Sequence, residues 1–166
     1  MTVLDRYSLQ LLAELQRDSR QTVQQLSKRI GLSATPCWKR VKEMEALGII
    51  RGYTVNIDRD KVGLQLCVIA EVNLTQHNEE LVKSFEKAVA ATPAVISCYS
   101  TTGQADYIVT VLVSDIKSYE LFLRDTLLKL PCVTHVRSSV VLKELKSAGP
   151  LPIGMPGSAG KQKASS

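Results

Sequence analysis

The sequence is poor in the residues that form metal centres, disulfide frameworks and membrane spans. It has two histidines and four cysteines among 166 residues, and no pair of cysteines has the C-x-x-C spacing of a zinc or redox motif. No run approaches the ~20 apolar residues of a membrane span, and the first residues lack the apolar core of a signal peptide. We therefore expect a cytoplasmic protein without a metal site, whose cysteines are reduced thiols buried like small apolar residues: Cys37, Cys67, Cys98 and Cys132.

Catalytic signatures are missing as well. The chain contains no phosphate-binding glycine loop, no G-x-S-x-G sequence and no histidine and carboxylate spacing typical of a catalytic metal. An enzyme of amino-acid metabolism is the rival class, because small α+β domains also occur in such enzymes. Without the catalytic parts, we expect a binding protein that uses no cofactor.

The charge is positive and concentrated at the two ends. The formal net charge is +5, and residues 1–60 hold 10 Lys+Arg against 7 Asp+Glu. Residues 61–142 are close to neutral, with 7 against 8, and residues 143–166 are basic again, with 4 against 1. This distribution places charge-dependent binding, such as that of DNA phosphates, at the ends and assigns the middle another role.

The first 50 residues carry the pattern of a three-helix helix-turn-helix domain. Leucines at helical spacing predict an amphipathic helix from Asp5 to Leu15. Thr22, with Gln25 three residues later, has the form of a capping box that opens a second helix, which Gly31 closes. A third helix is expected from Ser33, as its N-cap, to about residue 47, with Gly48 at its end.

The third helix is the expected recognition helix. At about 100° per residue, one face carries its apolar core residues, and the opposite face can enter a major groove. We expect Arg40, near the core boundary, to grip the DNA backbone. For Trp38, packing between helices and stacking on DNA both remain open, and the mixed charges alone would also fit a solvated helix face. The core residues are Cys37, Val41, Met44 and Leu47, and the candidate DNA contacts are Ser33, Ala34, Thr35, Trp38, Lys39, Arg40 and Lys42.

The rest of the chain reads as a second domain. Apolar alternation predicts strands at about 64–74, 95–102, 107–113 and 133–145, with helices at about 78–91 and 116–130. This βαββαβ order is the ferredoxin-like arrangement, an αβ-sandwich with an antiparallel sheet and both helices on one face. The other face would expose valines and isoleucines unless a second chain covers it, so we expect at least a homodimer.

The fold class expected is therefore α+β, with a winged-type helix-turn-helix domain before a ferredoxin-like domain. We place the helix-turn-helix at residues 1–50, a linker strand (Ile49 to Ile57) and connection at 51–63, and the second domain at 64–146. Residues 147–166 are rich in Ser, Gly, Pro and Lys, which predicts a flexible basic tail. Its Lys161 and Lys163 either touch DNA phosphates or have no binding role.

Long stretches of the chain resemble the leucine-responsive regulator/asparagine regulator (Lrp/AsnC) family. The helix-turn-helix reads LSKRIGLSATPCWKRV at residues 26–41 and is followed by EALGIIRGY at 45–53. GQADY at 103–107 and SSVVL at 138–142 continue the match, which covers about residues 3–146. The resemblance implies a transcription regulator whose C-terminal domains pair sheet to sheet into dimers, commonly assembled into tetramers or octamers, and bind amino-acid effectors between dimers.

The resemblance also implies where an effector would bind. Independently, Gly103 would let backbone amides approach a carboxylate, and Asp106 would accept from an ammonium group. The alternative is that both residues only shape a hairpin turn. Gln104 and Ala105 stand where many relatives have an acidic and an aromatic residue. The candidate effector contacts are Ser100, Thr101, Thr102, Gly103, Gln104, Asp106 and Tyr107, with Thr134, His135 and Val136 from the last strand.

The sequence thus predicts a sequence-specific, double-stranded DNA-binding regulator that responds to a small effector and is associated with the nucleoid. The alternative is an architectural protein that compacts DNA with little sequence preference. The two differ in the ratio of specific to non-specific affinity, since binding driven by phosphates alone weakens with salt for every sequence alike.

Overall fold

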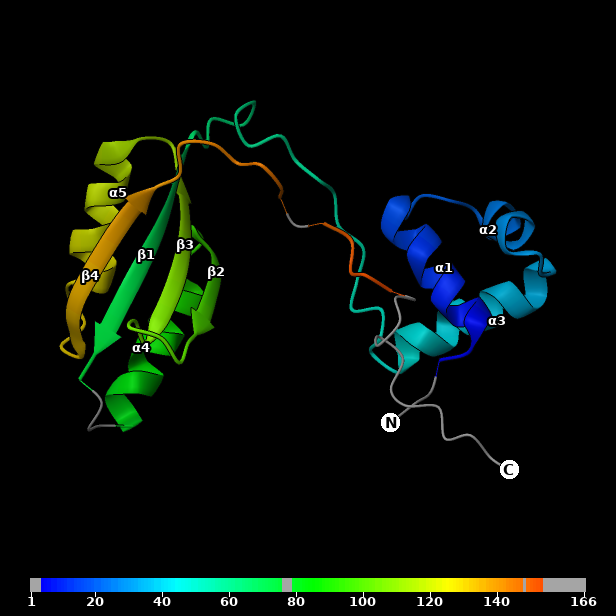
Figure 1. The fold of residues 1–166 in the computed structure, drawn as a ribbon, viewed down its shortest axis with the longest axis horizontal. Helices are drawn as coiled ribbons and strands as arrows, with labels where there is room; N and C mark the ends of the chain where they lie inside the picture. The colour runs from blue at the N-terminus through cyan, green and yellow to red at the C-terminus, as the bar shows by residue number, and fades with distance from the viewer. Residues whose placement is uncertain (1–3, 76–78, 148, 154–166) are drawn as a thin grey trace. The chain divides into compact units, whose positions relative to one another are not determined.

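The computed structural model describes residues 4–75, 79–147 and 149–153. The chain forms two compact units (Figure 1). Of the described residues, one unit takes in those up to Val55 together with 146–147 and 149–153, and the other takes in those from Asn56 to Leu145. No helix in the described ranges is long and apolar enough to span a membrane. Lys161 and Lys163 lie outside the described residues.

The N-terminal unit contains the three predicted helices, α1 (Arg6–Arg17), α2 (Val23–Ile30) and α3 (Ala34–Ala46). The predicted capping box is confirmed: Thr22 Oγ1 accepts from the Gln25 amide, and Gln25 Oε1 accepts from the Thr22 amide. Gly31 ends α2 with a left-handed φ of 72°, and Gly48 follows α3 with a φ of 68°. Local sequence signals therefore set the helix boundaries.

One apolar cluster holds these three helices together. Leu11 of α1 and Leu26 of α2 are buried against three of the predicted core residues of α3: Cys37, Val41 and Met44. The prediction for Leu47 is wrong, because its side chain is 52% exposed. Ile49 and Ile50 pack against that end of the cluster instead, after Gly48 has turned the chain. Ser33 is the N-cap residue of α3, but its side chain makes no capping hydrogen bond.

The predicted linker strand at residues 49–57 is absent. The amides of Ile49 and Ile50 both donate to the Met44 carbonyl, at 2.9 and 3.1 Å, which holds these residues in the turn after α3. Residues 51–58 have no regular secondary structure, since no neighbouring strand pairs with them in the described chain. An alternating pattern is not sufficient for a strand when no ladder partner is available.

The C-terminal unit has the predicted βαββαβ order. Its elements are β1 (Leu66–Leu74), α4 (Glu79–Ala91), β2 (Val95–Ser100), β3 (Tyr107–Val113), α5 (Ile116–Phe122) and β4 (Val133–Val140). The strands form one antiparallel sheet in the order β2-β3-β1-β4, with both helices on one face (Figure 1). The last strand ends at Val140 rather than near Leu145.

The two faces of the sheet differ in cover. Val68, Ala70 and Val72 of β1 are fully buried beneath the helices, with Val109 and Val111 of β3. On the other face, Ile69 is 38% exposed and Tyr99 63% exposed. Among the described residues, the sheet is therefore bare on one side, as the sequence predicted.

The predicted helix at 116–130 is interrupted by a wider turn. Residues Leu123–Leu127 form a π-helical segment, η1, with the Leu128 amide donating to the Leu123 carbonyl at 2.8 Å. The extra residue in this turn rotates Leu127 into the core, where it is fully buried. An α-helix continued from Phe122 would have placed Thr126, a polar residue, nearer that position.

The part of the tail that the structure describes forms hydrogen bonds with α1. Leu151 donates its amide to Gln16 Oε1 at 2.6 Å, and Gln16 Nε2 donates to the Leu151 carbonyl at 3.4 Å. Leu151 is therefore paired with α1 in this structure, and the flexibility of residues 147–166 stays a prediction. An amide side chain on a helix surface can form such a two-way pair with any extended backbone, which the tail sequence does not reveal.

Candidate functional site

The start of α3 presents an open surface. Ser33, Ala34 and Thr35 are exposed, and Trp38 is 52% exposed. Pro36 is accommodated in the first helical turn, where no intrahelical N–H bond is lost. The exposure of Trp38 makes its ring available to a partner rather than confining it to a seam between helices.

The three cations of α3 differ in their surroundings. Lys39 is exposed and has no ion pair or hydrogen bond with any residue that the structure describes. Lys42 Nζ lies 2.6 Å from Glu45 Oε2. Arg40 Nη2 lies 2.8 Å from Asp5 Oδ2, beside α1, so this guanidinium is directed toward the domain itself. The geometry leaves Lys39 as the uncompensated positive charge of the predicted set.

The predicted effector loop, residues 101–106, connects β2 to β3 and folds over the end of β1. Asn73 Nδ2 donates to the Gln104 carbonyl at 2.7 Å, and the Leu74 amide donates to Asp106 Oδ2 at 2.8 Å. Within the loop, the Thr101 amide donates to the Asp106 carbonyl at 2.9 Å. The loop is thus tied to β1 by both a backbone and a side-chain acceptor.

The second predicted stretch reaches the same place. Thr134 Oγ1 donates to the Asn73 carbonyl at 3.0 Å, and His135 pairs with Asn73 in the ladder between β1 and β4. Thr134 and His135 are exposed there, as are Thr102, Gly103 and Gln104 of the loop. The structure therefore brings the two candidate stretches together around Asn73, a residue that no sequence pattern singles out.

Two of the predicted effector contacts, Tyr107 and Val136, do not face the exposed loop surface. Tyr107 is 8% exposed, and its ring packs in the core 4.8 Å from that of Phe85. Val136 is half-buried and packs against the same core. Both belong to the helix-covered face, because their strands leave the loop with alternating side-chain directions. Gly103 does not have a left-handed backbone conformation, and a Cβ added to it would meet no atom within 4 Å. Gly103 therefore contributes open space beside the loop rather than a special backbone conformation.

Comparison with known proteins identifies the family of both units. Residues 67–151 match the family described as Lrp/AsnC ligand binding domain, and residues 4–51 match a winged helix-turn-helix DNA-binding family. The leucine-responsive regulatory protein of Escherichia coli is 37% identical over 150 residues, which cover 90% of this chain and 92% of that protein. This chain belongs to the Lrp/AsnC family.

Other Lrp/AsnC proteins extend the match. The Bkd operon transcriptional regulator of Pseudomonas aeruginosa is 35% identical over 91% of this chain and all of its own length. The solved structure of a Neisseria meningitidis transcriptional regulator in complex with L-Met has a TM-score of 0.87 at 34% identity, covering 91% of this chain and 97% of that one. This Lrp/AsnC chain is accordingly a DNA-binding transcriptional regulator that responds to an effector, not an enzyme.

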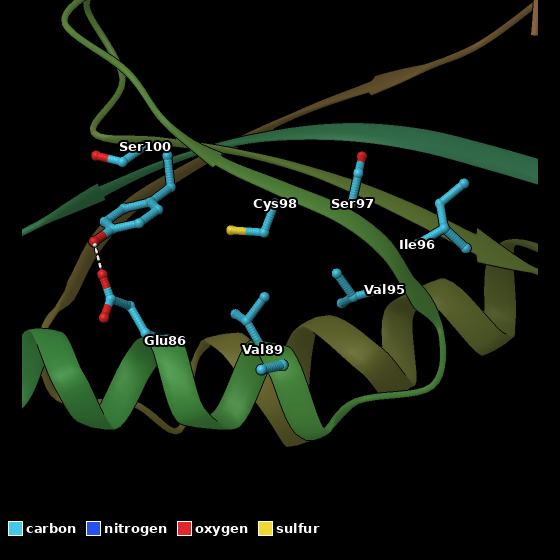
Figure 2. Close-up of a pocket in the computed structure, with 9 residues that line it drawn as sticks. Glu86, Val89, Val95, Ile96, Ser97, Cys98 and Ser100 are labelled. Carbon is cyan, nitrogen blue, oxygen red and sulfur yellow. Dashed lines mark hydrogen bonds between the residues drawn. The ribbon is translucent and has the colours of Figure 1, made fainter. Parts of the chain in front are cut away.

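The Lrp/AsnC ligand-binding unit also contains a groove between α4 and the edge strand β2. Its volume is about 370 Å³, and Figure 2 shows Glu86 and Val89 of the helix facing Val95 and Cys98 of the strand. Two predicted effector residues, Ser100 and Tyr107, line this groove rather than the exposed loop surface.

Two side chains of the groove, Tyr107 and Cys98, have raised pKa values. Tyr107 donates its hydroxyl to Glu86 Oε1 at 2.7 Å, the dashed line in Figure 2. Burial, followed by this carboxylate, raises the pKa of Tyr107 to about 12. Burial and Glu86 also raise the pKa of the Cys98 thiol, so the groove does not hold a reactive thiolate. Cys98 is nevertheless exposed, which corrects the prediction that all four cysteines are buried.

The described residues contain no cluster of His, Cys, Asp and Glu that could hold a metal ion. Sequence reasoning missed four residues of these sites. Asp5 and Glu45 form ion pairs with the cations of α3, Tyr53 binds Glu45 where the chain leaves α3, and Asn73 binds the loop. Glu45 and Tyr53 lie within the quoted motif at residues 45–53, and Asp5 lies outside the quoted motifs. Only the folded chain shows which groups these residues contact.

Proposed function

We propose that the effector of this regulator is a free amino acid and that it binds where residues 101–106 and 134–135 meet the end of β1. The observation that carries the proposal is the convergence of these two stretches on Asn73 and Leu74. The Neisseria meningitidis relative was solved with L-Met, which supports the same class of ligand for this chain.

The chemistry of the loop suits both charged groups of an amino acid. Asp106 carries the negative charge that attracts an ammonium group, while it also accepts the Leu74 amide. The open space at Gly103 lets a carboxylate approach the loop backbone. Thr102, Gln104 and His135 are exposed around it and supply further polar contacts. Ser100, Tyr107 and Val136 contribute through the loop's shape rather than by direct contact.

We further propose that the bare sheet face joins two copies of this chain, and that such dimers assemble into tetramers or octamers. Ile69 and Tyr99 are exposed on this face, and Ile108 lies beside Tyr99 in the ladder. An unpaired apolar sheet face of this kind normally marks an interface. Ile69→Lys should shift the light-scattering mass in size-exclusion chromatography toward a smaller assembly, whereas Ser84→Lys on exposed α4 should leave the mass unchanged. An unchanged mass for Ile69→Lys would exclude this face.

On DNA, we propose that α3 enters the major groove and reads a defined sequence, in the cytoplasm and on the nucleoid. Exposed Thr35, Trp38 and Lys39 supply the surface. Fluorescence anisotropy with a duplex selected by the full-length protein from a randomised pool, against a scrambled duplex, tests it at two salt concentrations. Preference for the selected duplex that changes when amino acids are added is expected. Equal, salt-sensitive binding to both would favour an architectural role.

A further inference from the structure

The side chain of Arg40, on α3, contacts Asp5 and Tyr7 at the start of the N-terminal unit. Its Nη2 lies 2.8 Å from Asp5 Oδ2, and its guanidinium carbon lies 5.9 Å from the centre of the Tyr7 ring. Its Nε is buried and has no hydrogen-bond partner among the described residues. The guanidinium is therefore drawn in against α1, with 31% of the side chain exposed.

Asp5 is itself fixed by the backbone of α1. Its Oδ1 accepts from the Ser8 amide at 2.8 Å, as the N-cap of that helix. One carboxylate therefore has two tasks: Oδ1 caps α1, and Oδ2 receives Arg40 of α3. Since the cap sets the place of the carboxylate, it also sets the place of the guanidinium.

This contact adds direction to an otherwise apolar interface. The two helices also meet in the buried cluster around Leu11, Cys37 and Val41. Burial of apolar surface is non-directional, whereas a hydrogen-bonded ion pair has a preferred geometry. A charge-assisted bond from Arg40 to Asp5 favours one rotation of α3 about its axis. It therefore also fixes the direction of the preceding residue, Lys39.

We propose that Arg40 is a positioning residue for DNA recognition and not a phosphate contact. Held by Asp5, it sets the rotation of α3, so that Lys39 and the exposed start of the helix face the groove in one register. Its own charge is compensated within the domain. The inference rests on the proposed sequence-specific binding of DNA by α3.

The two roles of Arg40 predict opposite effects for one substitution. Asp5→Asn keeps a good N-cap but removes the charge that holds Arg40. If Arg40 positions the helix, this variant lowers the preference for the selected duplex over the scrambled one. If Arg40 binds a phosphate, Asp5 competes with DNA for it, so the variant binds both duplexes as well as the parent or better.

The experiment compares the parent, Asp5→Asn, Arg40→Gln and the double variant in full-length protein. Selected and scrambled duplexes are titrated at several salt concentrations, below the unfolding temperature of every variant. In each single variant, we expect the affinity ratio between the duplexes to fall about fivefold, which is the size expected for a half-exposed ion pair. In the double variant the ratio should fall no further than in either single variant, because both substitutions remove the same contact. The slope of log affinity against log salt should be the same for Arg40→Gln as for the parent.

Loss of folded protein alone would lower the active fraction for both duplexes equally and leave their ratio unchanged, so the ratio separates positioning from stability. A slope reduced by about 0.9 in Arg40→Gln would assign Arg40 to a phosphate and overturn the proposal. An unchanged ratio in Asp5→Asn would overturn it as well. If the parent protein shows no preference for any duplex, the proposed sequence-specific function is wrong, and the proposal for Arg40 is wrong with it. That outcome is seen in the parent protein alone, so it is distinguishable from a failure of the Arg40 proposal.

Discussion

Tyr53 donates its hydroxyl to Glu45 Oε1 at 2.8 Å, while the second oxygen of the same carboxylate lies 2.6 Å from Lys42 Nζ. The Lys42 hydrogen bond, followed by that of Tyr53, lowers the pKa of Glu45. Burial, followed by the bond to Glu45, raises the pKa of Tyr53. The end of the recognition helix is therefore joined to the segment by which the chain leaves the helix-turn-helix unit.

Tyr53→Phe should release this segment. The variant loses one hydrogen bond at a half-exposed site, so we expect about 0.5 kcal/mol at most in the free energy of unfolding. Trypsin cleavage after Arg51, followed by mass spectrometry, should become faster because the segment is less restrained. Tyr7→Phe, which keeps the ring beside Arg40, is the control. Equal rates of cleavage after Arg51 in both variants would show that the bond does not hold the segment.

Lys39→Ala should weaken DNA binding more than any other single change of a cation on α3, because Lys39 is uncompensated. Loss of one phosphate contact reduces the slope of log affinity against log salt by about 0.9, whereas loss of a base contact lowers the affinity ratio between specific and scrambled duplexes. Anisotropy titrations distinguish the two outcomes. Lys87→Ala, on exposed α4, should leave both values unchanged, and the same result for Lys39→Ala would remove this residue from the interface.

Two substitutions at Asp106 separate effector binding from loop structure. Asp106→Asn keeps an oxygen that accepts the Leu74 amide but loses the charge, so the melting temperature should hold while the DNA-binding response to amino acids disappears. Asp106→Ala should lose the response and also about 1–3 kcal/mol of stability, since the Leu74 amide is left unpaired. Thermal unfolding and effector-dependent anisotropy measure the two effects. A normal response in Asp106→Asn would leave this residue as a turn former only.

Tyr107 makes stability sensitive to alkaline pH. Its pKa is raised to about 12 by burial and by Glu86, while an unfolded tyrosine ionises near pH ~10. A raised pKa contributes stability that is full below the unfolded value and is lost as pH rises through the folded one, so the loss falls between about pH 10 and 12 and amounts to roughly 2–3 kcal/mol.

Tyr107→Phe supplies the comparison. At neutral pH it should be less stable than the parent by about 1 kcal/mol, since the bond to Glu86 is gone. Denaturant unfolding across the alkaline range should show this difference shrinking or reversing above pH ~10, because the variant cannot ionise there. A constant difference across that range would show that Tyr107 does not titrate as its surroundings indicate.

The capping box of α2 should contribute measurably to the N-terminal unit. Thr22→Ala removes the acceptor for the Gln25 amide, which should cost about 1 kcal/mol of stability, and Thr22→Ser should restore most of it. Gln24→Ala, an exposed change in the same turn, is the control in thermal unfolding. Equal melting of Thr22→Ala and Gln24→Ala would mean that the box is not a stabilising feature.

Sequence reasoning succeeded where the relevant contacts are local. The box of Thr22 and Gln25, the left-handed turns at Gly31 and Gly48 and the βαββαβ order of the second unit depend on neighbours within a few positions or on a repeating pattern. The family resemblance likewise rested on contiguous motifs, and the family that it predicted is confirmed, together with the helix-turn-helix and the ligand-binding domain.

Other features were decided only when distant segments met. Residues 49–57 alternate like a strand, but they lack a partner in the described chain and form none. Leu127 enters the core through a wide helical turn that nothing in its own segment marks. The proposed effector loop is bound to Asn73 of another strand, a contact that depends on the folded sheet. Arg40 is a neighbour of Lys39 in sequence, but only the folded chain pairs it with Asp5 of the N-terminal segment. The amino-acid order sets each side chain's chemistry and its local backbone, whereas the partner that a charged or polar group finds depends on which segments the folded core brings within hydrogen-bonding distance.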